Sequence, residues 1–477
     1  MASYDDQGSG CYVLEAGAYE ISLRTDSHHI VDTEVYNVDT TVTYDESNPR
    51  SDDQVAAVNQ FDFARGEVTY LSRADGFANY DQATAAPAST ELPDTYEVTG
   101  NGTYDPTLYN DDSDVMPTTG AKNGLTLYDL RGASYDDAQW EALLDQLSID
   151  DMVEMIGYGG YGSPAIASVG KLKALDADGP AGISARVSAD ADQTRGLGYP
   201  SEIVIAATWN TDMAKLAAEG LGAEARDLGV DGWYAPSTNM HRSAFAGRNF
   251  EYYSEDPMLS AAMAVAECDG IYEYGLYPFI KHFALNDQET NRNAMLCTWT
   301  TEQAMREIYL RPFEACIKSS GSNPITVMSS YNYIGTTWAA ACPELQKTVL
   351  REEWGFQGMV LSDYFGNYGY MDADKAVRGG TDMMQATAGN DAIMTDTTSA
   401  TSVLAMRQAC KNIMYTMVNS YTYDTYDPNA IPGWVMTFYT ADAVIAVILV
   451  LSEVALMVNY KKKRTMFSNQ ALHPFRP

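Results

Sequence analysis

From Tyr135 onward, short apolar runs alternate with stretches of helical periodicity. The apolar runs predict strands at 172–175, 203–206, 229–235, 279–283, 325–330, 359–361 and 381–384. The stretches between them predict helices near 211–228, 255–274, 301–320, 343–353 and 400–421. This alternation is typical of a parallel sheet with crossover helices, and about 290 residues suit a (β/α)8 TIM-type barrel. A doubly wound sheet is the alternative, but no glycine-rich nucleotide fingerprint follows a strand.

The residues ahead of this region have a different pattern. Apolar and polar residues alternate at 18–24, 31–38 and 66–71, which predicts half-buried strands. These strands are too few for a complete β-sandwich, so we expect residues 1–75 to form part of one. Residues 76–135 are rich in Asp, Asn, Gly, Pro, Thr and Tyr and predict a surface linker, which leaves 136–425 for the barrel.

The end of the chain predicts a membrane anchor. Residues 434–459 are largely apolar and long enough for one crossing, and the basic cluster Lys461 to Arg464 follows them. The positive charge predicts that the tail, 460–477, is cytoplasmic and that the larger part of the protein is extracellular at the cell membrane. Because Asp442 and Glu453 interrupt the run, an apolar terminal helix packed on the protein is the alternative.

Charge and metal-ligand content exclude several classes of partner. The formal net charge is −35 and the sequence pI is about 4.3, which argues against nucleic acid because its phosphates would be repelled. The five histidines form no ligand cluster and the six cysteines have no zinc or redox spacing. We therefore predict no metal site and no cofactor.

Polar residues follow the predicted strands at the points where these strands end. The candidate site residues are Asp178, Arg248, Lys281, His282, Tyr331, Asp363 and Tyr364. In a barrel such strand ends converge on one rim, and their charged groups suit a polyhydroxylated ligand. Asp363, with the ring of Tyr364 beside it, fits nucleophilic attack at an anomeric carbon.

The same series resembles glycoside hydrolase family 3. The likeness covers about 170–385 through Asp-Gly-Pro at 178–180, Gly-Arg-Asn-Phe-Glu at 247–251, Ser-Glu-Asp-Pro at 254–257, Lys-His-Phe at 281–283, Ser-Tyr-Asn at 330–332 and Ser-Asp-Tyr at 362–364. The resemblance implies that Asp363 is the nucleophile of a retaining β-glucosidase-like enzyme acting by double displacement. It also implies that Asp178, Arg248, Lys281, His282 and Tyr331 bind the sugar. The family often has Trp where this chain has Tyr364.

Two expectations concern the geometry and charge of this site. Neighbours on a regular strand point to opposite faces, so Lys281 and His282 reach one sugar only if the backbone is irregular. We expect a bulge or a cis non-proline peptide between them. We also expect Arg248 and Lys281 to keep Asp363 ionised, because positive charge lowers a carboxyl pKa.

The general acid cannot be assigned from the sequence. In family members that this chain resembles, the acid usually comes from a second α/β domain, and permuted members have that domain and a fibronectin type III-like sandwich ahead of the barrel. Residues 1–75 look like the end of such a sandwich, so we expect the acid upstream or on a partner. Two functions remain open: a membrane-anchored hydrolase of small β-glycosides or oligosaccharides, and a non-hydrolytic sugar-binding barrel.

Overall fold

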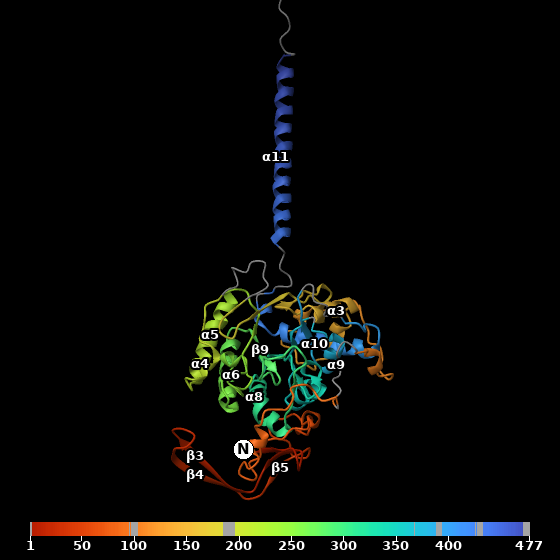
Figure 1. Ribbon diagram of the computed structural model, residues 1–477. Helices are drawn as coiled ribbons and strands as arrows, with labels where there is room; N and C mark the ends of the chain where they lie inside the picture. The colour runs from red at the N-terminus through yellow and green to blue at the C-terminus, as the bar shows by residue number, and fades with distance from the viewer. Residues whose placement is uncertain are drawn as a thin grey trace, which may run out of the picture. The chain divides into compact units, whose positions relative to one another are not determined.

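The computed structural model describes residues 2–94, 96, 104–184, 196–366, 368–387, 394–424, 426 and 433–470. The chain divides into two compact units, Met1–Asp424 and Thr425–Pro477 (Figure 1). The first unit contains the sheet and the helices that cover it. The domain boundaries inside this unit that the sequence suggests stay a prediction.

A curled seven-stranded sheet forms the centre of the first unit, in the order β15-β14-β11-β9-β8-β7-β6. Its strands are β6 Gly162–Ser163, β7 Ala174–Asp178, β8 Gly232–Tyr234, β9 Tyr277–Phe283, β11 Thr326–Ser329, β14 Val360–Tyr364 and β15 Met383–Gln385. All neighbours pair in parallel except β6, which is antiparallel to β7. The curl brings the segment before β6 to β15, where Gly159 N donates to Met384 O at 2.8 Å and Gly160 N to Ala386 O at 3.0 Å.

Helices cover the outside of this sheet, with α5, α6 and α8 on one side and α3, α9 and α10 on another (Figure 1). The α-helices of the first unit are α1 Tyr80–Ala83, α2 Gln139–Leu144, α3 Ile149–Gly157, α4 Glu202–Ala206, α5 Thr211–Asp227, α6 Pro257–Tyr272, α7 Glu302–Ala304, α8 Arg311–Ser319, α9 Ala373–Gly379 and α10 Ala400–Val418. The π-helical segments are η6 Met305–Tyr309 and η8 Glu344–Glu353. Short 3₁₀ turns are η1 Asp62–Ala64, η2 Pro106–Tyr109, η3 Leu127–Leu130, η4 Ala167–Val169, η5 Asn249–Glu251, η7 Ala339–Ala341 and η9 Tyr421–Tyr423. A separate three-stranded sheet has the order β10-β12-β13. Its strands are β10 Cys297–Thr298, β12 Tyr333–Ile334 and β13 Thr337–Trp338.

Two strand predictions are wrong. Residues 203–206 belong to the short helix α4, not to a strand. Four apolar residues in a row suit either element, and Val204 remains 54% exposed, which a barrel strand would not allow. The described part of the sheet therefore has six parallel strands and one antiparallel strand, where the sequence predicts eight parallel ones. Residues 66–71 form no strand either, and Tyr70 instead donates its hydroxyl to Arg65 O.

The N-terminal residues form two small sheets. One has β1 Ser3–Asp5, β2 Cys11–Leu14 and β5 Val42–Tyr44 in the order β1-β2-β5, and the other is a ribbon of β3 Gly17–Arg24 and β4 Ile30–Val38. The alternation at 18–24 and 31–38 is thus correctly predicted as strand. The ribbon exposes Ile21 and Leu23 to 63% and 66%, so its apolar face has no cover within the described residues. A fibronectin-like sandwich is not seen in residues 2–75.

Buried ion pairs hold the N-terminal residues against the helices that cover the curled sheet. Arg306, in η6, is 2% exposed and pairs with Glu302 at 2.7 Å and Glu353 at 2.7 Å. Its guanidinium also donates to Val58 O at 2.8 Å, and Glu302 accepts from Phe61 N at 2.6 Å. Residues 58–61 are therefore part of the same packed unit as the curled sheet and its helices.

The second unit contains one described element, the helix α11 Gly433–Gln470. Its residues 433–468 have a mean hydropathy of 2.4 in their most apolar window, and none of that window is buried. Length and composition therefore permit this helix to cross a membrane.

Candidate active site

A cavity of about 570 Å³ lies at the carboxyl ends of the parallel strands. Its lining includes all of the residues that the sequence singled out: Asp178, Arg248, Lys281, His282, Tyr331, Asp363 and Tyr364. The other lining residues are Tyr161, Tyr234, Glu251, Arg292, Met328, Tyr368, Gln385 and Thr387. The convergence follows from the fold, because parallel strands deliver their last residues to one rim.

Asp363 lies near the end of β14 with one carboxylate oxygen held and the other free of hydrogen bonds. Oδ1 accepts from Tyr364 N at 2.7 Å, whereas buried Oδ2 has no hydrogen-bond partner and lies 3.9 Å from His282 Nε2. Burial raises the pKa of Asp363 to about 6, although the Arg248 and Arg292 guanidinium groups lower it. The expected lowering by positive charge is therefore present but is outweighed by burial, and the carboxylate is still mostly ionised at pH 7.

Asp178 lies at the end of β7 and is held by the turn that follows it. Its Oδ1 accepts from Lys281 Nζ at 2.9 Å and from Gly179 N at 2.9 Å. Gly179 has a φ of +122°, and a Cβ there would lie 1.8 Å from Gly182 O, so only glycine fits. Burial opposes ionisation, but the Lys281 ammonium overcomes it and holds the pKa of Asp178 below its usual range.

Lys281 and His282 both face the cavity although they are neighbours on β9. The peptide bond between them is cis, which confirms the prediction of an irregular backbone at this point. The segment after β8 fixes both residues: Lys281 N donates to Pro236 O at 3.0 Å, and Asn239 exchanges bonds of 2.8 and 3.0 Å with the backbone of His282.

The His282 imidazole is kept neutral by its surroundings. Burial and the positive charges of Arg248 and Lys281 lower its pKa well below the usual range. Its Nδ1 lies 3.4 Å from Asn239 Oδ1 and 3.5 Å from the Tyr252 hydroxyl, so one nitrogen is engaged inside the protein. The Nε2 atom faces Asp363, which leaves it available for a ligand hydroxyl.

Arg248 is held by two carboxylates on the other side of the cavity. It pairs with Glu251 and lies 3.5 Å from Glu289 Oε1. Burial opposes its charge, but the neighbouring Tyr252 and Glu251 raise the pKa of Arg248 above its usual range. The same Arg248 side chain thus forms ion pairs and lines the cavity.

An aromatic wall completes the site. The Tyr331 ring packs edge-on against Tyr368 at 5.7 Å, and the Arg292 guanidinium lies 4.7 Å from the Tyr331 centroid. Arg292 and Tyr368 were not among the sequence candidates. Arg292 follows Lys-His-Phe on a polar loop without periodicity, and only its proximity to that motif could have indicated its place.

Comparison with known proteins assigns this fold and cavity to a family. Residues 168–420, more than half of the chain, match the family described as "Glycosyl hydrolase family 3 N terminal domain". The chain belongs to glycoside hydrolase family 3. This is a family of O-glycosyl hydrolases, and the resemblance inferred from the sequence is confirmed.

Several family 3 proteins are similar to this chain over part of their length. The "Beta-glucosidase" of Rhizobium radiobacter is 39% identical over 227 residues, which is 47% of this chain and 27% of that protein. The "Beta-glucosidase" of Ruminococcus albus is 30% identical over 392 residues, which is 77% of this chain and 37% of that protein. This chain thus spans 27% and 37% of the length of these two relatives.

Solved structures agree with the fold. β-Glucosidase 3B from Thermotoga neapolitana, in complex with α-D-glucose, has a TM-score of 0.53 at 30% identity, covering 61% of this chain and 44% of that one. A β-glucosidase from Paenibacillus barengoltzii has a TM-score of 0.66 at 24% identity, covering 91% of this chain and 48% of that one, which shows the fold alone.

The family 3 cavity contains three described lining carboxylates, and two of them are engaged. Asp178 is paired with Lys281, and Glu251 is paired with Arg248. A general acid must hold a proton at neutral pH, and a neighbouring cation favours the ionised form of a carboxyl group instead. Among these three carboxylates, Asp363 is the one with no ion pair to Lys or Arg among the described residues, and its Oδ2 has no hydrogen-bond partner.

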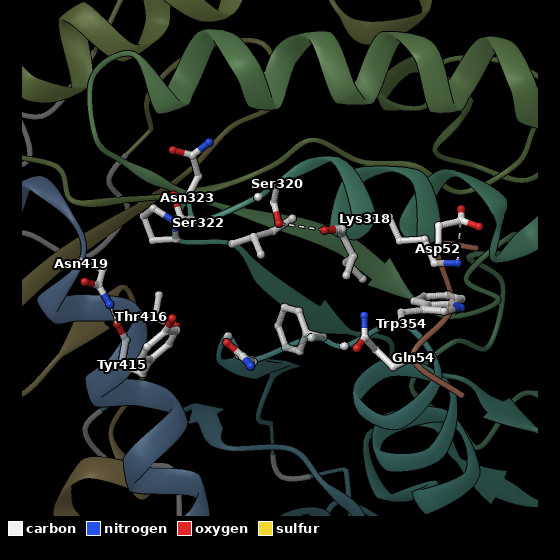
Figure 2. A pocket seen from close by; sticks show the side chains of 18 residues that line it. Asp52, Gln54, Lys318, Ser320, Ser322, Asn323, Trp354, Tyr415, Thr416 and Asn419 are labelled. Carbon is white, nitrogen blue, oxygen red and sulfur yellow. Dashed lines mark hydrogen bonds and ion pairs between the residues drawn. The ribbon is translucent and has the colours of Figure 1, made fainter. Parts of the chain in front are cut away.

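A second cavity, of about 340 Å³, lies at the opposite ends of the strands (Figure 2). Its lining includes Ile325, just before β11, and Gly358, two residues before β14. Lys318 Nζ at its edge pairs with Glu314 at 2.8 Å and lies 3.6 Å from Asp52. Because it lies at the amino ends, where barrel residues serve stability, we assign the chemistry to the first cavity.

Proposed function

We propose that this chain contains the sugar-binding and nucleophile-bearing barrel of a retaining β-glucosidase. The observation that supports this most directly is Asp363, buried at a strand end, with Oδ2 unpartnered and facing a cavity of charged and aromatic groups. The β-glucosidase names of the relatives support glucose as the glycone, and the size of the cavity suits a small β-glycoside.

The mechanism that we propose is double displacement. Asp363 Oδ2 attacks the anomeric carbon, the bond to the leaving oxygen breaks, and water later hydrolyses the glycosyl ester. Asp178, Lys281 and His282 bind ring hydroxyls and strengthen these bonds in the transition state. The Tyr364 and Tyr331 rings border the sugar, and Arg248 supports the charge of Asp363.

The proton for the leaving oxygen must come from outside the described lining residues. Asp178 and Glu251 are held in ion pairs, so neither serves as the acid. We propose that an upstream or partner α/β domain supplies it, with the N-terminal strands as the end of a fibronectin-like sandwich. Without such a domain, hydrolysis of substrates with poor leaving groups is slower by about 10²–10⁴-fold.

The engaged carboxylates also support a second function. A barrel that has the sugar-binding residues but no acid within reach binds a sugar without turning it over. Hydrolysis of an unactivated disaccharide separates the two functions, because it needs the acid as well as Asp363.

The helix α11 supports a location for either function. We propose that it crosses the cell membrane once, with Lys461 to Arg464 on the cytoplasmic side and the barrel outside.

Covalent labelling tests the proposed nucleophile. The full chain in detergent is incubated with a 2-fluoro-2-deoxy-glucoside bearing a dinitrophenyl leaving group, which departs without an acid. We expect a label on the peptide that contains Asp363, found by mass spectrometry. Asp363→Asn should abolish it, while Asp212→Asn, the same charge change at the start of α5, should not. A folded wild-type chain that takes no label favours the binding function or another glycone.

A further inference from the structure

The geometry around Lys281 and His282 depends on a residue outside the cavity. The segment 236–239 follows β8 and runs beside the Lys281–His282 peptide, with a bridge between Ser237 and Lys281. Thr238 N donates to Lys281 O at 2.7 Å, and Asn239 holds the backbone of His282 from both sides. The direction of the two sugar-binding side chains is therefore set by this segment.

Glu202 holds that segment from behind. It is the first residue of α4, its side chain is fully buried, and its Oε1 accepts from Ser237 N at 2.8 Å. Ser237 is itself fully buried, so its N–H has no access to water if this acceptor is lost. Glu202 is not among the residues that line the cavity.

We propose that Glu202 is a positioning residue that holds Lys281 and His282 in their sugar-binding orientation through Ser237. This inference rests on the proposed role of that pair in binding the glycone. Removing the carboxylate leaves Ser237 N–H unpaired, and a buried donor without an acceptor is costly enough to move the segment. The segment takes the Lys281–His282 peptide with it, because four hydrogen bonds join the two.

The conservative variant Glu202→Gln tests whether the positioning role of Glu202 requires a negative charge. Burial and the neighbouring Glu267 carboxyl raise the pKa of Glu202 well above its usual range, which favours the neutral form. Glu202→Gln is neutral and keeps a carbonyl oxygen for Ser237 N–H. It should therefore preserve the position of Lys281, whereas Glu202→Ala should not.

A matched control exists at a distance from the cavity. Glu302 is 2% exposed and also accepts from a buried backbone N–H, that of Phe61, at 2.6 Å. Glu302→Ala removes the same kind of bond from the N-terminal residues, together with the ion pair to Arg306, and leaves the bonds of segment 236–239 in place. It should lower thermal stability without changing the reactivity of Asp363.

The test uses the full chain in detergent and the rate of labelling by the dinitrophenyl 2-fluoro-glucoside. We expect Glu202→Ala to lower the second-order rate about tenfold or more and Glu202→Gln by less than about threefold. In a Lys281→Met background, Glu202→Ala should cost less than in the wild type, because the part of its effect that passes through Lys281 is already lost and only the part through His282 remains. Equal losses in Glu202→Ala and Glu302→Ala, or full additivity with Lys281→Met, would overturn the proposal.

A crystal structure of the Glu202→Ala variant decides the matter even if the wild-type chain takes no label. A shift of Lys281 Nζ away from Asp178 Oδ1, which lie 2.9 Å apart in the wild type, supports the positioning role while the nucleophilic function fails. An unmoved Lys281 with intact bonds to segment 236–239 refutes the positioning role whatever the chemistry of Asp363.

Discussion

Asp363 combines burial with two cationic neighbours, and these influences oppose each other. Desolvation disfavours the carboxylate, while Arg248 and Arg292 favour it, and the net pKa of about 6 shows that desolvation is the larger. A nucleophile with this pKa is ionised at neutral pH and more basic than an exposed carboxylate.

The pH dependence of labelling follows from that pKa. Because only ionised Asp363 attacks, we expect the labelling rate to rise with pH, to reach half its maximum near pH 6, and to level off above about pH 7. The dinitrophenyl group needs no acid, so one ionisation should describe the curve. A rate already at its plateau at pH 4 would contradict the raised pKa.

The same burial means that ionised Asp363 lowers the free energy of unfolding. Its pKa is raised above the usual 3.8, so the folded state disfavours the ionised form. The cost appears as pH rises from about 4 through 6 and is complete at pH 8. Asp363→Asn should therefore stabilise the fold by about 2–3 kcal/mol at pH 8 and by little at pH 4. Thermal unfolding at the two pH values measures this, and equal gains at both would contradict it.

At the scale of single residues, motifs predicted seven of the residues that line the cavity. Asp178 and Asp363 end strands, and such positions can be read from an apolar run followed by a carboxylate. Arg292 and Tyr368 lie on loops, whose path depends on tertiary contacts that no local pattern encodes. The direction of the Asp363 pKa shift could not be predicted from the sequence either, because depth of burial is a property of the folded chain.

At the scale of elements, the helix that contains Arg306 links the barrel to the N-terminal residues. Its guanidinium neutralises Glu302 and Glu353, which are 2% and 1% exposed. Arg306→Met leaves both carboxylates buried without a partner, so we expect a loss of about 3–5 kcal/mol. Urea unfolding measures it, with Arg24→Met on the exposed ribbon as the control. A loss below about 1 kcal/mol would show that water replaces the guanidinium.

Element predictions succeeded where length and periodicity agreed. The helix at 211–228 and the strand at 279–283 appear as α5 Thr211–Asp227 and β9 Tyr277–Phe283. The run at 203–206 failed because four β-branched and small residues fit a helix as well as a strand. In the structure the preceding Glu202 lies in the helical first turn, and its buried carboxylate accepts from Ser237 N.

At the scale of the whole molecule, the length and composition of α11 permit it to cross a membrane. We expect the full chain to remain with membranes after an alkaline carbonate wash and a chain ending at residue 432 to be released, because only the former has an apolar span. Far-UV circular dichroism of the shorter chain checks that it is folded. Release of the full chain by carbonate would show that α11 does not cross the membrane.

The contacts of the N-terminal residues also affect synthesis of the protein. Tyr4 N donates to Glu307, which lies 303 positions later in the chain, and Val58 O accepts from Arg306, which lies 248 positions later. A ribosome adding roughly 5–20 residues per second needs on the order of 10–60 s to cover these intervals. During that time the first strands are made but have no docking surface. Until Glu307 and Arg306 are made, Tyr4 and Phe61, which are buried in the folded protein, therefore stay accessible to chaperones.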